Sequence, residues 1–193
     1  MILYIHGFNS SPQSIKAQQT LAFFQQKFPE INVIIPQIPC YPQPAINLLE
    51  DIIVKNQKVI KGVIGSSLGG YLASYFVEKY SVKSVIVNPA VRPYELLGDI
   101  QGVQTNPYTK EQFELTAAHM EVLKSIDTPS LTRHDNYWLL QQEGDEVLDF
   151  TQAVTKYAGC KQTVEPGGEH RFVGFERFLP GIAEFFQLAQ TIK

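Results

Sequence analysis

The chain has 193 residues, of which 44% are hydrophobic, and a formal net charge of -3. This length suits one domain, residues 1–193, whose apolar content can fill a core on both sides of a sheet. The lysines and arginines are scattered along the sequence, whereas binding to nucleic acid or to an anionic lipid surface requires a concentrated basic patch. We therefore expect a single domain with no nucleic-acid partner.

The apolar run at the start of the chain is too short to be a secretory signal or a membrane span. No basic segment precedes it, and His6-Gly7 ends it. We therefore expect a cytoplasmic protein without membrane insertion. Cys40 and Cys160 lie far apart and match no zinc or redox spacing, which predicts reduced thiols and no metal site.

Short apolar runs rich in Val and Ile alternate with helical patterns along the chain. This alternation predicts an α/β fold: a three-layer α/β/α sandwich around a mostly parallel sheet of about six strands. The predicted strands cover residues 2–5, 31–35, 62–64, 84–87, 137–140 and 162–164. The predicted helices cover residues 13–28, 45–56, 68–80, 146–157 and 172–192, the last with a kink at Pro180-Gly181.

One segment, approximately residues 91–130, interrupts this alternation. It contains prolines and glycines, then a predicted helix near residues 110–125, and it is too long for an ordinary connection. It leaves the fourth strand at the carboxyl edge, where open α/β sheets bind ligands. We interpret it as a small helical lid, with a packing insertion as the alternative.

The segment Gly65-Ser66-Ser67-Leu68-Gly69 joins the third predicted strand to a helix and matches G-x-S-x-G. In this pattern a sharp turn presents the central serine at the carboxyl edge of a sheet, and the glycines avoid collisions with neighbouring backbone. The pattern assigns Ser67 as a nucleophile. The alternative is a glycine-serine turn that only caps a helix.

A reactive serine needs a general base at the same edge of the sheet, and the chain has four histidines. His134 precedes a strand, so it lies at the amino edge. His119 has the spacing of a packing or surface residue in the inserted helix, and His6 is placed to hold a turn by hydrogen bonding. His170 follows the last strand in a glycine-rich loop, and we select it as the base.

An acid is needed to orient the histidine. Asp145 follows the strand before the histidine loop, at the carboxyl edge, although it is also placed to cap a helix opening at Glu146. Glu143 is a close competitor, whereas we expect Glu146 and Asp149 to lie on that helix and point away. The chain order of serine, aspartate and histidine is the order expected of α/β-hydrolases.

An oxyanion hole would complete the site. The backbone N–H of Leu68, directly after the nucleophile, is the first expected donor, and that of Phe8, in the turn after the first strand, is the second. This chemistry needs no cofactor, and we expect none.

These residues resemble the α/β-hydrolase superfamily over nearly the whole chain and, more narrowly, small bacterial esterases of the YqiA type. The resemblance implies a strand order of 2-1-3-4-5-6 and hydrolysis of a small-molecule ester or acyl-CoA thioester. Two features depart from the pattern: the oxyanion segment is His-Gly-Phe, and Gln142 replaces a glycine before the acid. The segments that carry the resemblance are residues 4–11, 65–70, 88–90, 144–148 and 167–172.

A protein that keeps this architecture without turnover, as a ligand-binding or interaction protein, is the alternative function. Three catalytic residue types at one edge argue against it, because a pure binder does not need them. Phosphate binding by the glycine-rich turn is weaker still, because no lysine follows Gly69-Gly70 as a P-loop requires.

Overall fold

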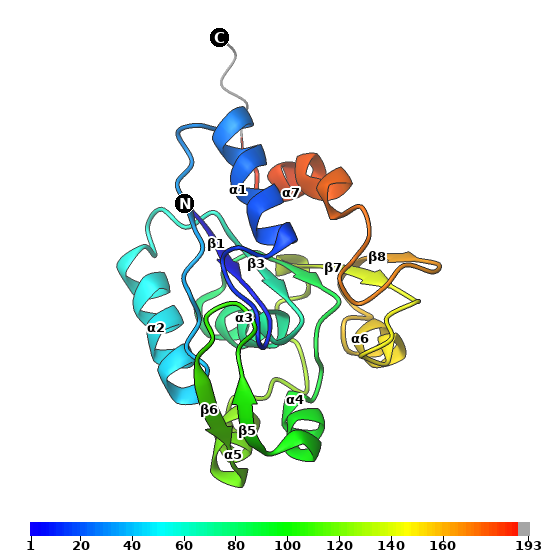
Figure 1. Cartoon of the computed structure of the whole chain (residues 1–193). Helices are drawn as coiled ribbons and strands as arrows, with labels where there is room; N and C mark the ends of the chain where they lie inside the picture. The colour runs from blue at the N-terminus through cyan, green and yellow to red at the C-terminus, as the bar shows by residue number, and fades with distance from the viewer. Residues whose placement is uncertain (189–193) are drawn as a thin grey trace.

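The structure is a computed structural model that describes residues 1–188, with a central sheet of six strands (Figure 1). The strands lie in the order β2-β1-β3-β4-β7-β8, and every neighbouring pair is parallel. This arrangement confirms the predicted fold class and the strand order implied by the resemblance. The strands are Ile2–Ile5 (β1), Val33–Ile34 (β2), Gly62–Ser66 (β3), Ser84–Val87 (β4), Tyr137–Gln142 (β7) and Lys161–Glu165 (β8).

Helices cover both faces of the sheet, as Figure 1 shows. The strands are buried on both sides, so their side chains feed two cores: Ile2 and Tyr4 of β1 pack with α1 and α7, whereas Leu3 and Ile5 pack with α2, α3 and α6. Within residues 1–188, every helix is too short or too polar to span a bilayer. The helices of these two layers are Ile15–Lys27 (α1), Pro42–Lys55 (α2), Leu68–Tyr80 (α3), Phe150–Lys156 (α6) and Leu179–Phe185 (α7).

The predicted C-terminal helix over residues 172–192 is wrong in its first part. A loop and a 3-10 turn over Phe175–Phe178 precede α7, and Pro180 stands in the first turn of that helix instead of kinking a longer one. Proline suits this place because its missing N–H would have no helical acceptor there. Residues 189–192 of the predicted helix lie outside the described residues.

The inserted segment is less helical than predicted. It holds α4 (Pro93–Leu96), a 3-10 turn, the antiparallel hairpin of β5 (Gly102–Thr105) and β6 (Gln112–Leu115), and α5 (Ala117–Ser125). The prediction of a helix over residues 110–125 is therefore wrong over β6, where exposed and buried residues alternate with the period of a strand. The hairpin packs on the body through Phe113, whose ring centroid lies 5.9 Å from that of Phe8.

The register of the sheet brings the carboxyl ends of its central strands together. Ile5 of β1 pairs with Gly65 of β3, Ser66 pairs with Val87 of β4, and Val87 pairs with Leu140 of β7. The loops that leave these strands therefore start side by side at one edge of the sheet. This is the edge where doubly wound α/β sheets place their ligands.

Candidate active site

Ser67 stands in a strained turn between β3 and α3. Its backbone has φ 55° and ψ -121°, a conformation that costs about 1–3 kcal/mol for a residue with a side chain. A Cβ atom on Gly69 would lie 2.1 Å from the carbonyl oxygen of Ile5, and one on Gly65 would lie 2.4 Å from the carbonyl oxygen of Gly69. Both glycines of the motif are thus required by close backbone contact, as the sequence indicated.

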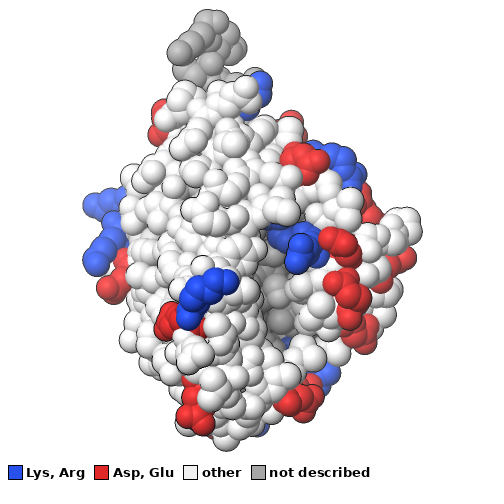
Figure 2. Space-filling view, viewed as in Figure 1, with Lys and Arg blue, Asp and Glu red and all other residues white. Residues whose placement is uncertain are grey.

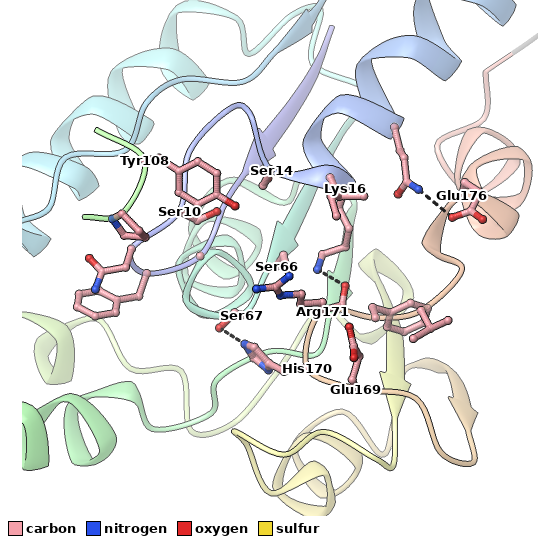
Figure 3. Close-up of a pocket in the computed structure, with 18 of the residues that line it drawn as sticks. Ser10, Ser14, Lys16, Ser66, Ser67, Tyr108, Glu169, His170, Arg171 and Glu176 are labelled. Carbon is pink, nitrogen blue, oxygen red and sulfur yellow. Dashed lines mark hydrogen bonds between the residues drawn. The ribbon is translucent and has the colours of Figure 1, made fainter. Parts of the chain in front are cut away.

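The structure brings Ser67, His170 and Asp145 together. Ser67 Oγ lies 3.1 Å from His170 Nε2 (Figure 3). On the other side of the ring, His170 Nδ1 lies 2.8 Å and 3.0 Å from the two carboxylate oxygens of Asp145. The Asp145 side chain is fully buried, whereas that of His170 is 21% exposed. When Nδ1 carries the ring proton and donates a hydrogen bond to Asp145, Nε2 is free to accept the proton of the serine hydroxyl.

Asp145 is held by the turn that follows β7. Its Oδ1 accepts hydrogen bonds from the backbone N–H groups of Val147, at 2.9 Å, and Leu148, at 2.8 Å. It does not cap α6, since that helix begins later and Asp149 caps it by accepting from the N–H of Thr151. The expected helix start at Glu146 is therefore wrong. The carboxylate of Asp145 serves a tight turn and the imidazole at once.

Glu146 also differs from expectation. Because it precedes α6, its side chain does not point away from the site: Glu146 Oε2 accepts the backbone N–H of His170 at 2.9 Å. That hydrogen bond lowers the pKa of the Glu146 carboxyl group. Glu146 thus fixes the backbone of the histidine loop, while Asp145 holds the ring.

The buried side-chain amides of Asn88 and Gln142 anchor the backbone of the histidine loop. Asn88 Nδ2 donates to the carbonyl oxygens of Glu169, at 3.0 Å, and His170, at 3.1 Å, while its Oδ1 accepts the N–H of Gln142 at 2.9 Å. Asn88 is fully buried and adopts φ 38°, a conformation that asparagine tolerates better than most residues. It ties the ends of β4 and β7 to the loop that carries the imidazole.

Gln142 is the second anchor. Its Oε1 accepts the backbone N–H groups of Glu169, at 3.2 Å, and Val173, at 2.9 Å. A Cβ atom on Gly168, where φ is +78°, would lie 2.1 Å from this oxygen, so glycine is required there. The departure from the family pattern at Gln142 therefore has a structural role: its side chain holds both sides of the His170 residue.

The other histidines lie apart from the triad, as predicted. His6 is 3% exposed; its Nδ1 lies 3.0 Å from the carbonyl oxygen of Gly7, and its Nε2 accepts the N–H of Ile38 at 3.1 Å. Burial lowers the pKa of His6, which favours the neutral ring that can accept this N–H. His119 caps α5 together with Thr116. His6 thus fixes the turn that presents Phe8.

The two expected oxyanion donors, the N–H groups of Phe8 and Leu68, each directly follow a residue of the contact between Gly7 and Ser67. Among residues 1–188, neither the N–H of Phe8 nor that of Leu68 has a hydrogen-bond acceptor. The preceding turn lies against the nucleophile, since a Cβ atom on Gly7 would be 3.1 Å from Ser67 Cβ and 3.5 Å from Ser67 Oγ. Unpaired N–H groups next to the serine are the donors that a tetrahedral oxyanion needs.

A cavity of about 460 Å³ opens beside Ser67 and is drawn in Figure 3. The inserted segment contributes Pro107 and Tyr108 to its lining. This segment is joined to the turn after β1, because Asn106 Nδ2 donates to the carbonyl oxygen of Ser10 at 3.1 Å. The insertion therefore forms part of the cavity, although its motion as a lid stays a prediction.

Sequence reasoning missed the groups that support the triad and the basic wall of the cavity. Asn88 and Gln142 stand at the carboxyl ends of β4 and β7, so the rule that selected the acid could also have found them. Lys16 could have been noticed because a cation in the first turn of a helix opposes the helix dipole. Arg171 carries no such signal, and only the structure shows that it lines the cavity.

The chain belongs to the family described as "Uncharacterised protein family (UPF0227)", whose profile matches residues 1–187. This family is the YqiA-like one that the sequence resembled. The comparison gives no activity, because the family description names none.

Solved structures show the α/β-hydrolase fold over nearly the whole chain. A protein from Agrobacterium vitis S4 matches with a TM-score of 0.74 and 14% identity, over 96% of this chain and 87% of that one. Est1E from Butyrivibrio proteoclasticus, bound to ferulic acid, matches with a TM-score of 0.66, 15% identity and coverages of 96% and 87%. Mouse alpha/beta hydrolase domain-containing protein 10 matches with a TM-score of 0.65, 18% identity and coverages of 96% and 89%. At these identities the likeness establishes the fold alone.

Proposed function

We propose that this member of UPF0227 is a serine hydrolase that cleaves carboxylic esters or acyl thioesters through an acyl-enzyme. The observation that carries the proposal is the unbroken chain of hydrogen-bond distances from Ser67 Oγ to His170 Nε2, at 3.1 Å, and from His170 Nδ1 to Asp145, at 2.8 Å. A serine hydroxyl is a weak nucleophile by itself, and this arrangement is the one that activates it.

The first half of the reaction forms the acyl-enzyme. Ser67 Oγ attacks the carbonyl carbon of the substrate while His170 Nε2 takes the hydroxyl proton, and the carbonyl electron pair moves onto oxygen. The N–H groups of Phe8 and Leu68 stabilise this oxyanion by about 3 kcal/mol each. The oxyanion then collapses, the bond to the alcohol or thiol breaks, and His170 gives its proton to the leaving group.

The second half releases the acid. Water attacks the acyl-enzyme and gives a proton to His170 Nε2, and collapse of the second oxyanion returns the proton to Ser67 Oγ. Asp145 keeps its hydrogen bond to Nδ1, and its carboxylate stabilises the imidazolium that forms in each half. No step in this sequence needs a metal or an organic cofactor.

The comparisons support the class of reaction but not the substrate. Est1E was solved with ferulic acid bound, and this ligand is a property of that protein. An esterase domain from a Rhodothermus marinus protein shares the fold with a TM-score of 0.68. A preference between ester and thioester, and the expected cytoplasmic location, remain predictions.

Hydrolysis of a 4-nitrophenyl short-chain ester tests the proposal. We expect Ser67→Ala to lower kcat by about six orders of magnitude, because all members of such a triad act together. Ser66→Ala is the matched control: Ser66 is the neighbouring buried serine, the last residue of β3, and its loss should leave most of the activity. Activity retained in Ser67→Ala but lost in Ser66→Ala would show that Ser67 is not the nucleophile. A parent protein that hydrolyses the ester no faster than an inactive Ser67→Ala variant would favour the binding protein.

A further inference from the structure

We propose that Lys16 and Arg171 form a recognition site for a carboxylate on the substrate, so that the enzyme prefers monoanionic esters to neutral ones. This inference rests on the proposed hydrolase function and adds a class of substrate to it. Its basis is a pair of adjacent basic side chains in the wall of the catalytic cavity.

The two side chains come from distant parts of the sequence and meet beside Ser67. Lys16 belongs to α1 and Arg171 follows the catalytic histidine; both line the cavity, and Lys16 Nζ donates to the carbonyl oxygen of Arg171 at 2.6 Å. Figure 3 shows both side chains on one side of the cavity, with Ser10 and Tyr108 on the other. Because Lys16 and Arg171 line the same cavity as Ser67, a group that they bind would belong to the molecule being cleaved.

Neither cation has an acidic partner. Among residues 1–188, no carboxylate oxygen lies within 4 Å of a side-chain nitrogen of Lys16 or Arg171. By contrast, the arginine nearby on the C-terminal side, Arg177, is paired with Glu165 at 3.0 Å. The cations of the cavity wall are therefore available to a ligand.

This placement is unfavourable for the protein alone. Burial, followed by the neighbouring charge of Arg171, lowers the pKa of Lys16 to about 8, and the more weakly acting charges of Asp145 and Glu169 offset this only in part. Lys16 also stands in the first turn of α1, where the helix dipole disfavours a positive charge. A bound anion would offset both effects, whereas a purely structural role would be served equally well by a neutral donor.

The other charged groups near this wall favour a single negative charge on the ligand. Glu169 and Glu176 also line the cavity, and Glu176 accepts a hydrogen bond from Gln19 at 2.9 Å. In Figure 3 both glutamates lie beyond Arg171 as seen from Ser67, and Figure 2 shows basic groups next to acidic ones around the hollow on this face. Because the local excess of positive charge is small, a carboxylate fits better than a dianionic phosphate. The guanidinium can hold its two oxygens with parallel N–H bonds.

The alternative role for Lys16 is to position the histidine loop through its bond to the Arg171 carbonyl. The two roles predict different losses. A positioning defect would slow the hydrolysis of every ester equally, since it acts on His170. Loss of a carboxylate site would slow only the hydrolysis of anionic esters, so the ratio between matched substrates separates the two.

The experiment compares kcat/KM for two matched pairs of esters. The acyl pair is 4-nitrophenyl hydrogen adipate and 4-nitrophenyl hexanoate, and the leaving-group pair is 3-carboxy-4-nitrophenyl butyrate and 4-nitrophenyl butyrate. We expect the parent enzyme to prefer the anionic ester about tenfold in one pair, the effect of one charge-assisted contact. Arg171→Gln and Lys16→Gln should each abolish that preference and largely keep the hydrolysis of the neutral ester. Lys27→Gln, an exposed cation at the other end of α1, is the control and should keep the preference.

Three results would overturn the inference: no anionic preference in either pair, an unchanged preference in Arg171→Gln and Lys16→Gln, or equal losses on both esters of a pair. In each case the parent enzyme would still hydrolyse the neutral esters, so the proposed function would be unaffected. If the parent enzyme cleaves none of the four esters above the level of Ser67→Ala, the proposed function fails instead.

Discussion

The nucleophile turn and the histidine loop position their side chains by different physical means. At the turn, backbone atoms touch so closely that a Cβ atom on Gly69 would lie 2.1 Å from the carbonyl oxygen of Ile5. The histidine loop is instead suspended from hydrogen bonds, with Asn88, Gln142 and Glu146 bonded to the backbone of Glu169, His170 or Val173. Steric contact defines where Ser67 stands, and polar anchors define where the imidazole stands.

This difference predicts separate consequences for substitutions in the two regions. Close packing cannot yield without moving a strand or a helix, so changes at the turn should act on stability. Hydrogen bonds to a loop can be lost while the fold remains, so changes at the anchors should act on kcat. Three predictions test this division, and a fourth tests the charge of Lys16 beside the histidine loop; they follow in order of decreasing effect.

Asp145→Asn should lower kcat by about 10⁴-fold with little effect on the fold, because the neutral amide favours the wrong tautomer of His170. Steady-state hydrolysis of 4-nitrophenyl butyrate measures this effect. Asp149→Asn is the matched control on the same connection, because Asp149 caps α6 and does not contact the imidazole. If Asp149→Asn lost as much activity as Asp145→Asn, the assignment of the acid would be wrong.

Asn88→Ala should lower kcat by about 10²-fold, because it frees the loop carbonyls and allows the imidazole to move by a fraction of an ångström or more. We expect KM to change much less than kcat, since Asn88 does not line the cavity. Asn136→Ala, the control for loss of an asparagine amide, removes one exposed side-chain bond to the carbonyl oxygen of Ser81, at 3.0 Å, and should leave kcat unchanged. An unaltered kcat in Asn88→Ala would remove the loop anchor from the account.

Gly69→Ala should lower the free energy of unfolding by about 2 kcal/mol, because the methyl group meets the backbone of β1 and not a movable side chain. Urea unfolding followed by circular dichroism measures this loss. Gly98→Ala is the control, since a Cβ atom there meets nothing within 4 Å. A Gly69→Ala protein as stable as the parent would show that packing at the turn is looser than the structure indicates.

The smallest expected effect is a change with pH in the preference for the anionic ester, through the charge of Lys16 beside the histidine loop. The charges that act on Lys16 are those of Arg171, Asp145 and Glu169, and the pKa of Lys16 is about 8. As the pH rises through this value Lys16 loses its charge, so the preference for the anionic ester should fall severalfold between about pH 7 and pH 9. The ratio of kcat/KM values cancels any change in His170, which acts on both esters, and a ratio that is constant with pH would exclude a role for the charge of Lys16.

The parts of the fold that the sequence predicted are those with strong local signals. Buried parallel strands give continuous apolar runs, so all six strands of the sheet were found, and the strained turn requires glycine at two fixed places. The candidate triad followed from residue type, chain order and the edge of the sheet. Its members lie within hydrogen-bond distance in the structure, although their catalytic roles stay a proposal.

The errors arose where two local patterns compete or where support is non-local. The segment Gln112–Leu115 has the periodicity of a strand, but the predicted helix included it. Aspartate is a favoured N-cap residue, and the helix was predicted to start after Asp145, whereas Asp149, four residues later, is the N-cap. Asn88 and Gln142 both bond to the backbone of Glu169, which follows them in the chain by 81 and 27 positions, respectively. The position of both residues at the carboxyl ends of strands could have marked them as candidates, but no period in the sequence shows which residues they bond to, so these hydrogen bonds became visible only when the loops were placed together.

The most direct test of the central claim is covalent labelling of the serine. Incubation with a fluorophosphonate, followed by intact-mass measurement and peptide mapping, should show one added phosphonyl group on Ser67, and labelling should be lost in Ser67→Ala and strongly slowed in His170→Ala. Labelling that stays at the level of Ser67→Ala in the parent protein, or that maps to another serine, would contradict the activation of Ser67 by His170.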